Sequence, residues 1–171
     1  MMKIGAKEEE PLRVRIFTDG ACSENPGPGG WACVFNTEDK CKTFSGNEQM
    51  TTNNRMELKA VIESFKKAIH MKHADETDFE LYSDSAYVVN SINNGWVEKW
   101  QLNNWKTTKN EDVKNRDLWE ELAYYRNRAM SMGIYINIIK IKGHAGNTFN
   151  ELVDKLAKQE SMKAKEAKNE A

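Results

Sequence analysis

The sequence has few cysteines and no long apolar run, and each shortage excludes a class of protein. Its three cysteines form no C-x-x-C pair, which argues against a disulfide scaffold and a zinc site and fits a reducing cytoplasm. No apolar stretch approaches the roughly 20 residues that span a bilayer. The opening MMKIGAKEEEP lacks the apolar centre of a signal peptide. The sequence therefore predicts a cytoplasmic protein without membrane segments.

An excess of charge of either sign is also missing. The 25 Lys and Arg residues nearly balance the 26 Asp and Glu residues, so no global positive field indicates nucleic acid. Any such binding must come from a local patch. With 39% hydrophobic and 30% charged residues among 171, the composition is typical of one globular domain. We expect a flexible lead-in over 1–11, the domain over 12–160 and a frayed tail over 161–171, in a monomer without an obligate protein partner.

Apolar periodicity predicts early strands followed by alternating helices and strands. Alternating apolar residues from Leu12 to Ile16 predict a strand that ends at Asp19. Apolar residues from Leu58 to Ile69 recur at helical spacing. The predicted order, β-β-β-α-β-α-α-α-β-α, favours a mixed sheet with helices on its faces. The segments are strands over 12–19, 30–36, 41–47, 78–84 and 134–142, and helices over 53–70, 85–94, 96–100, 116–130 and 148–160, the last opened by a Thr148-x-x-Glu151 capping box.

The stretch GACSENPGPGG, residues 20–30, follows Asp19 directly. Its prolines and glycines disfavour a helix and permit a sharp turn. We expect the chain to turn away at once, so that Asp19 is left exposed beside backbone that a nucleic acid can approach closely.

Two acids, Asp19 and Asp84, each end a predicted strand. If these strands are parallel neighbours, they lie about 4.8 Å apart, and both carboxylates share the crevice at the strand ends. Carboxylates so close repel each other, and one takes up a proton unless a cation lies between them. Oxygen ligands without His or Cys favour Mg²⁺ or Mn²⁺ over zinc.

Each acid taken alone also has an ordinary structural interpretation. Asp19 precedes a glycine, which is a common turn pair, and Asp84 precedes a serine at a predicted helix start. Glu57 would stand at the third position of a helix capped by Asn54, where Glu often caps. Asp154 can be a surface acid on a helix that buries its apolar neighbours. No single acid decides between these interpretations.

Five segments in order resemble ribonuclease HI, the single-domain ribonuclease H of type 1. They are IFTDGACSENPGPGGW, TTNNRMEL, LYSDSAYVVNSI, the W…WKT…VKNRDLW region and KGHAGN…NELVDKLA. The resemblance spans about residues 12–158. It implies an α/β, ribonuclease H-like fold: a five-stranded mixed sheet of order 3-2-1-4-5 with helices on both faces. It also implies a divalent-metal-dependent endoribonuclease that hydrolyses the RNA strand of RNA–DNA hybrids.

The resemblance places the family's four metal-binding acids on Asp19, Glu57, Asp84 and Asp154 and its loop histidine on His144. Two Mg²⁺ ions, with Mn²⁺ as a substitute, would then serve phosphodiester cleavage. His144, with an ordinary pKa of about 6.5, can shuttle protons or help the product leave, although alone it equally fits a surface loop. We expect His144→Ala to lose only part of the activity. Expected substrate contacts are Cys22, Asn25, Thr52, Asn53, Asn54, Trp96, Trp100 and Asn115.

Two departures from the family pattern bear on substrate affinity. Residues 101–104, QLNN, carry no positive charge where bacterial relatives are commonly basic. Ala86 stands where many relatives carry a glutamine that can reach the hybrid. Fewer phosphate contacts weaken binding and flatten its salt dependence. Three alternatives stay open: a related DNA-acting nuclease, a hybrid-binding module without strong activity, and a structural domain whose acids are all caps.

Overall fold

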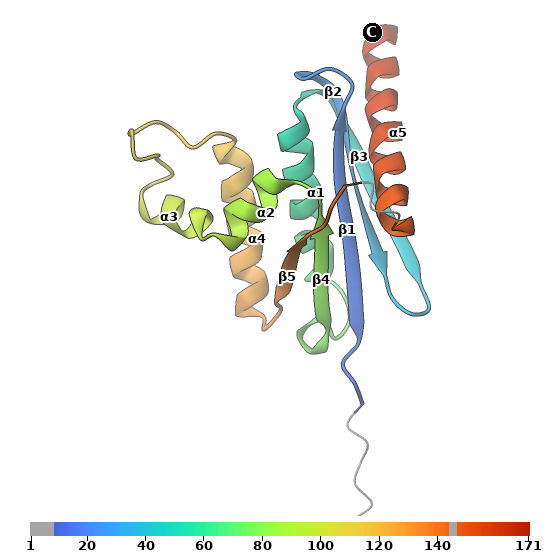
Figure 1. The fold of residues 1–171 in the computed structure, drawn as a ribbon, viewed down its shortest axis with the longest axis vertical. Helices are drawn as coiled ribbons and strands as arrows, with labels where there is room; N and C mark the ends of the chain where they lie inside the picture. Colours follow the sequence, from blue (N-terminus) through green and yellow to red (C-terminus); the bar gives the residue numbers. More distant parts are fainter. Residues whose placement is uncertain (1–8, 144–146) are drawn as a thin grey trace, which may run out of the picture.

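One mixed sheet forms the centre of the fold (Figure 1). The computed structural model describes residues 9–143 and 147–171, and its strands run in the order β3-β2-β1-β4-β5. β1 pairs antiparallel with β2, and β2 with β3, whereas β4 is parallel to β1 and β5 to β4. The predicted strand order is therefore confirmed. The strands are β1 (Arg13–Cys22), β2 (Gly27–Asn36), β3 (Cys41–Thr51), β4 (Asp78–Ser83) and β5 (Ile136–Lys140).

Helices cover both faces of this sheet, as predicted (Figure 1). α5 packs across β1, β2 and β3 on one face, while α1 packs against β1 and β2 from the other and also contacts α4. None of the described helices is long and apolar enough to cross a membrane. The helices are α1 (Asn53–Ala68), α2 (Ala86–Asn93), α3 (Trp96–Leu102), α4 (Arg116–Ser131) and α5 (Thr148–Glu170), with a 3-10 turn at Ala74–Glu76.

Two apolar clusters hold these layers together. The larger lies between the sheet, α1 and α4 and includes Ile16, Ile62 and Trp119, none of which is exposed to solvent. The smaller joins Phe17 of β1 to Val153 of α5. Successive side chains of a strand point to opposite faces, so Ile16 and Phe17 serve different clusters. Each large side chain that is fully buried contributes roughly 1.5–3 kcal/mol.

The strand that carries Asp19 is longer than predicted. β1 does not turn away at Asp19 but continues to Cys22, whose partner on β2 is Gly29. Its parallel pairing with β4, by contrast, reaches only Phe17. Asp19 thus stands two residues beyond the point where β1 and β4 separate. The expected turn at Asp19 was wrong because the residues after it remain paired with β2.

The last helix also differs from the prediction. α5 is capped by Asn147, whose Oδ1 accepts from the backbone N–H groups of Phe149 and Asn150, instead of by Thr148. It continues to Glu170, where a frayed tail over 161–171 was expected. Small residues of this segment, such as Ala164, are buried against the fold, and their packing is invisible to a search for large apolar residues. The predicted lead-in over 1–11 lies mostly outside the described residues.

Candidate active site

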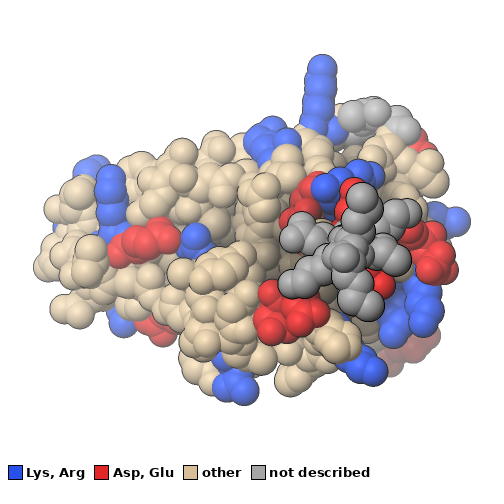
Figure 2. All heavy atoms as spheres, turned by 90° about the horizontal axis from the view of Figure 1, so that it is seen from below, with Lys and Arg blue, Asp and Glu red and all other residues tan. Residues whose placement is uncertain are grey.

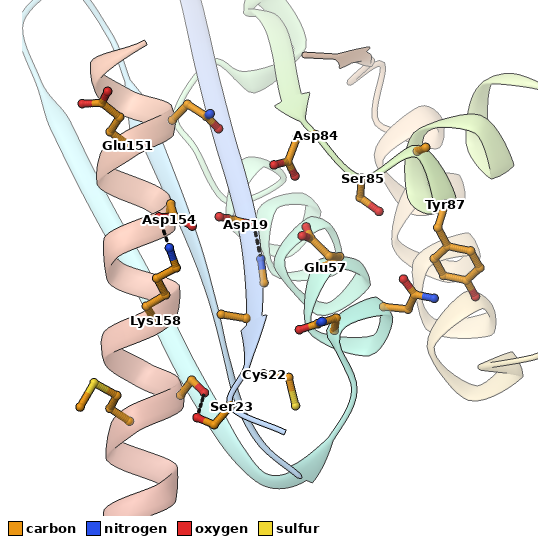
Figure 3. A pocket seen from close by; sticks show the side chains of 18 residues that line it. Asp19, Cys22, Ser23, Glu57, Asp84, Ser85, Tyr87, Glu151, Asp154 and Lys158 are labelled. Atoms are coloured by element: carbon orange, nitrogen blue, oxygen red, sulfur yellow. Dashed lines mark hydrogen bonds and ion pairs between the residues drawn. The ribbon is translucent and has the colours of Figure 1, made fainter. Parts of the chain in front are cut away.

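Three carboxylates from three different elements meet at one place (Figure 3). Asp19 comes from β1, Glu57 from α1 and Asp84 from the residue after β4. One carboxylate oxygen of each lies within 4.8 Å of the others. Asp19 is only 7% exposed, and its Oδ1 accepts from the Gly20 backbone N–H at 2.8 Å. The sequence prediction that these acids converge is confirmed.

Close backbone packing brings Glu57 to Asp19. A Cβ on Gly20 would lie 2.4 Å from the backbone N of Glu57, so only glycine lets β1 and α1 approach this far. α1 is capped by Thr52, whose Oγ1 accepts from the backbone N–H of Arg55 at 3.3 Å. Glu57 therefore lies beyond the capping positions, and its interpretation as a cap is wrong.

Asp84 is not a helix cap either. Ser85 caps α2, and its Oγ accepts from the backbone N–H of Val88 at 3.3 Å. The carboxylate of Asp84 points into the cavity instead (Figure 3). Gly143 approaches it from the loop after β5, since a Cβ there would lie 3.1 Å from Asp84 Oδ2. The next residue, His144, lies outside the described residues, so its role stays a prediction.

Burial and mutual repulsion disfavour the fully deprotonated state of this cluster. Burial raises the pKa of Asp19 to about 6, and the nearby charge of Asp84 adds to the increase despite the hydrogen bond with Glu57. Burial raises the pKa of Glu57 well above its ordinary value, and the charge of Asp19 adds to that. The positive charge of a bound metal ion would relieve this repulsion.

One oxygen of the cluster has no protein partner. Glu57 Oε2 is buried, and no donor among the described residues reaches it. An unsatisfied buried carboxylate oxygen is costly, because its lost hydration is not replaced. A divalent cation bound by oxygen ligands would satisfy it. The donor set and this vacant oxygen therefore fit a hard divalent cation.

The fourth predicted acid lines the same cavity but stands apart from the three. Asp154 of α5 and the acid cluster both border a hollow of about 810 Å³. Its Oδ2 accepts from Lys158 Nζ at 2.8 Å, an ion pair one turn along the helix (Figure 3). Its negative charge also contributes to the raised pKa of Asp19. Asp154 is thus positioned on the cavity wall, while its part in binding a metal stays a prediction.

Most of the predicted contacts on the acid side do border this cavity. Cys22, Asn53 and Asn54 line it, and Asn25 lies beside it, where its Oδ1 accepts from the Asn53 backbone N–H at 3.1 Å. Sequence analysis missed Lys158, which also lines the cavity. The four-residue spacing from Asp154 was the signal that would have found it.

A second, smaller hollow adjoins the first along α2. Ala86 and Tyr87 border both the acid cavity and a hollow of about 460 Å³, which Trp96 and Trp100 also line. Trp96 is 46% exposed, whereas Trp100 is partly buried and packs on Trp119 with ring centroids 5.3 Å apart. The two predicted tryptophan contacts are therefore unequal: one offers an open ring, and the other mainly anchors α3.

Asn115 is held in a fixed orientation at the start of α4. Its backbone has a φ of 60°, a conformation that Asn tolerates better than most residues. Its Nδ2 donates to Tyr87 Oη at 3.0 Å, and Trp119 Nε1 donates to the same oxygen at 2.9 Å. Arg55, which forms a two-pronged ion pair with Asp117, also reaches the Asn115 amide oxygen. This network connects the first turns of α1, α2 and α4.

Positive charge around α3 is partly neutralised. Lys106 forms an ion pair with Asp112 at 2.9 Å, and Lys99 lies over the Trp96 ring at 5.2 Å. Acidic and basic side chains are interspersed on the face drawn in Figure 2. Two of the lysines around α3 are therefore engaged by neighbouring side chains.

Comparisons with known proteins agree with this fold and site. The RNase H family matches residues 11–162. The chain is 50% identical over 147 residues to "Ribonuclease H" of Thermoanaerobacter sp. (strain X514), covering 86% of this chain and 88% of that protein. It is 49% identical to "Ribonuclease H" of Caldanaerobacter subterraneus subsp. tengcongensis, covering 88% of this chain and 92% of that protein.

A solved structure is similar as well. The crystal structure of LC9-RNase H1, described as a type 1 RNase H with the type 2 active-site motif, superposes with a TM-score of 0.75. It is 26% identical and covers 93% of this chain and 76% of that chain. The fold and the acid cluster define a nuclease-like α/β protein with a group of carboxylates that can hold a metal ion. The chain belongs to the ribonuclease H family.

Proposed function

We propose that the protein is an endoribonuclease that hydrolyses the RNA strand of RNA–DNA hybrids. The observation that carries this proposal is the group of three carboxylates within 4.8 Å, one of which has a buried oxygen without a partner. We further propose that two Mg²⁺ ions serve the site, that Mn²⁺ can replace them, and that the protein acts as a monomer in the cytoplasm. Family membership over residues 11–162 supports the substrate class.

Each acid of this chain would have its own role in cation binding, set by its position. Bound divalent cations would supply an activated water and stabilise the leaving oxygen of the RNA. Asp19, on the central strand and hydrogen-bonded to the Gly20 amide, lies between the other acids and suits a bridging position. Glu57 and Asp84 would hold one ion beside it, and Asp154 of α5 would hold the other. His144, which follows Gly143 in the sequence, would carry a proton during product release.

Two surfaces would distinguish a hybrid from other duplexes. RNA is recognised by its 2′-hydroxyl groups across a shallow minor groove, which suits the amides of Asn53 and Asn54 and the backbone near Cys22. Thr52 and Asn115 would bind the DNA strand, and the hydrogen bond to Tyr87 that orients the Asn115 amide supports this role for Asn115. Trp96 and Trp100 would pack against the same strand farther from the acids. Asn25 supports the asparagine pair through its bond to the Asn53 backbone.

A substrate panel tests the proposal. We expect Mg²⁺-dependent cleavage of the RNA strand in a labelled RNA–DNA hybrid, and no cleavage of duplex DNA or duplex RNA of the same sequence. Comparable cleavage of duplex DNA would favour the DNA-acting nuclease. Hybrid binding without cleavage, at any divalent cation concentration, would favour the binding module. Cleavage of the hybrid by EDTA-treated protein would contradict the metal-binding role of the acids.

We expect hybrid binding to depend only weakly on salt. Each phosphate contact contributes roughly −0.7 to −0.9 to the slope of log K against log salt. With two to four contacts from the lysines near α3, the slope should be about −1.4 to −3.6. Gln101→Lys should steepen this slope by about 1. Glu38→Gln adds the same charge in the exposed β2–β3 turn and should leave it unchanged. A steep wild-type slope, measured in Ca²⁺ to prevent cleavage, would contradict the prediction.

A further inference from the structure

The position of Asp154, unlike that of the other predicted site acids, depends on how a whole helix packs against the sheet. Asp19 is part of the sheet, and Asp84 directly follows β4. Glu57 lies on α1, whose backbone contacts β1. Asp154 lies on α5, which packs over the opposite face of the sheet (Figure 1). A small slide or rotation of α5 would move Asp154 relative to Asp19. The contacts that hold α5 against the sheet therefore control the position of Asp154.

A buried carboxylate ties α5 to β3. Glu160 is 8% exposed, and its two oxygens accept from Ser45 Oγ at 3.0 Å and from Asn47 Nδ2 at 2.6 Å. Lys163 of the same helix also donates to it at 3.1 Å. Burial alone would raise the pKa of Glu160, but the hydrogen bonds from Asn47, Lys163 and Ser45 hold it below its ordinary value. Such directed bonds fix the helix position, which an apolar side chain would do less specifically.

A buried hydroxyl ties α5 to the strand that carries Asp19. Ser161, 3% exposed, donates to the backbone carbonyl of Pro28 at 3.0 Å and lies 2.7 Å from Ser23 Oγ. With the Ser161 proton used on Pro28, the Ser23 hydroxyl donates to Ser161. Ser23 directly follows β1 (Figure 3). Both serines line the acid cavity. The contact thus joins α5 to the strand end four residues after Asp19.

The backbone of α5 also rests directly on β2. A Cβ on Gly30 would lie 2.4 Å from the carbonyl O of Ala157 and 2.6 Å from the backbone N of Ser161. With no side chain between them, a change in one backbone is passed on to the other. The Glu160 contacts reach β3, the Ser161 contacts reach the end of β1 and the start of β2, and the Gly30 contact lies on β2. Together they define both the position of α5 along its axis and its rotation.

Helix geometry links the position of Ser161 to that of Asp154. Ser161 is seven residues after Asp154, which is two turns and about 10 Å along the helix. Both residues therefore lie on nearly the same helical face, and both border the acid cavity. We propose that Glu160 and Ser161 are positioning residues that set Asp154 at the distance from Asp19 that cation binding requires. This inference rests on the proposed metal-dependent function of the site.

Cation binding, measured apart from activity, tests the inference. We expect Ser161→Ala to weaken Mn²⁺ binding in calorimetry by about tenfold, the lower range for partners that orient metal ligands. Glu160→Gln should act in the same direction. Ser23→Ala removes only the bond to Ser161 and should have a smaller effect in the same direction, because Ser161→Ala also removes the bond to Pro28. The double variant should be no worse than Ser161→Ala, since that substitution already breaks the contact with Ser23. In an Asp154→Asn background, Ser161→Ala should have no further effect on Mn²⁺ binding.

A matched control separates positioning from stability alone. Ser64 is also a fully buried serine, but its Oγ donates to Ala60 within α1, far from α5 in the chain. Ser64→Ala should change the melting temperature without changing Mn²⁺ affinity. If Ser161→Ala and Glu160→Gln both bind Mn²⁺ as the wild type does, the inference is overturned while the proposed function stands. If the wild type and Ser64→Ala bind no Mn²⁺, the cation site itself fails, and both proposals fail with it.

Discussion

Asp19→Asn should abolish hybrid cleavage and, in the absence of metal, make the protein more stable at neutral pH. The loss of activity follows from the position of Asp19 between the other acids, where a neutral amide can no longer balance divalent cations. Metal stabilisation of a transition state is worth several kcal/mol, which corresponds to a loss of about a thousandfold or more. His144→Ala should lose far less, because water can replace a proton carrier.

The gain in stability follows from the raised pKa of Asp19. Its pKa of about 6 in the folded protein exceeds the ordinary value of 3.8, so folding disfavours its charged form. At pH 7.5 the wild type must keep this carboxylate charged in a buried site or bind a proton. A difference of about two units corresponds to roughly 2–3 kcal/mol, which Asp19→Asn removes. The variant should melt about 5–10 °C higher than the metal-free wild type.

Two assays on one protein preparation check this prediction. Melting in EDTA at pH 7.5 gives the stability, and a labelled hybrid in Mg²⁺ gives the activity. Asp39→Asn, an exposed acid in the β2–β3 turn, is the matched control and should change neither measurement. An Asp19→Asn protein that cleaves normally, or that melts below the metal-free wild type, would contradict the roles assigned to this residue.

Sequence alone predicted the sheet order and the meeting of Asp19, Glu57 and Asp84 because both depend on long, ordered motifs. It could not predict that β1 continues past Asp19, since the glycines after it permit either a turn or a strand and pairing with β2 decides. It also missed the length of α5. Ser161 and Ala164 are small, and Ser161 packs against Gly30 of another element, a contact that no local pattern records.

The helix caps illustrate the same limit on a smaller scale. Thr52, Asn53 and Asn54 were all candidate caps of α1, and any of them has suitable chemistry. Only the backbone conformation, with Thr52 at φ −131°, selects the cap. That choice matters for function, because it moves Glu57 out of the capping positions and leaves its carboxylate available to the cluster.

The second large expected effect is the change of folding stability with pH. Stability should fall as pH rises, which is opposite to the contribution of most acids. The pKa values of Asp19 and Glu57 are raised in the folded protein, so the folded state binds more protons than the unfolded state near neutral pH. The stability contributed by their protonated forms is complete below the unfolded pKa near 4. It is lost as pH rises through the folded pKa of Asp19, about 6. Metal-free protein should therefore melt at lower temperature at pH 8 than at pH 5.

Acids with lowered pKa values do not obscure this window. Glu160 and Asp117 contribute stability that is present above their ordinary pKa values and lost only at more acidic pH. Between pH 5 and 8 they stay charged in both states. The fall in melting temperature over this interval thus reports chiefly on the acid cluster, and Asp19→Asn should reduce it.

Divalent cations should reverse the fall, because they bind the deprotonated cluster. Mg²⁺ at about 100 times its dissociation constant adds about 2.7 kcal/mol to the stability of a protein that binds it only when folded. The increment should be larger at pH 8 than at pH 5, where protons compete for the same oxygens. Melting curves in EDTA and in Mg²⁺ at both values measure it, with Asp19→Asn as the control that loses most of the increment. An increment that is equal at both pH values, or unchanged in Asp19→Asn, would show that the cation binds elsewhere and not at the three carboxylates.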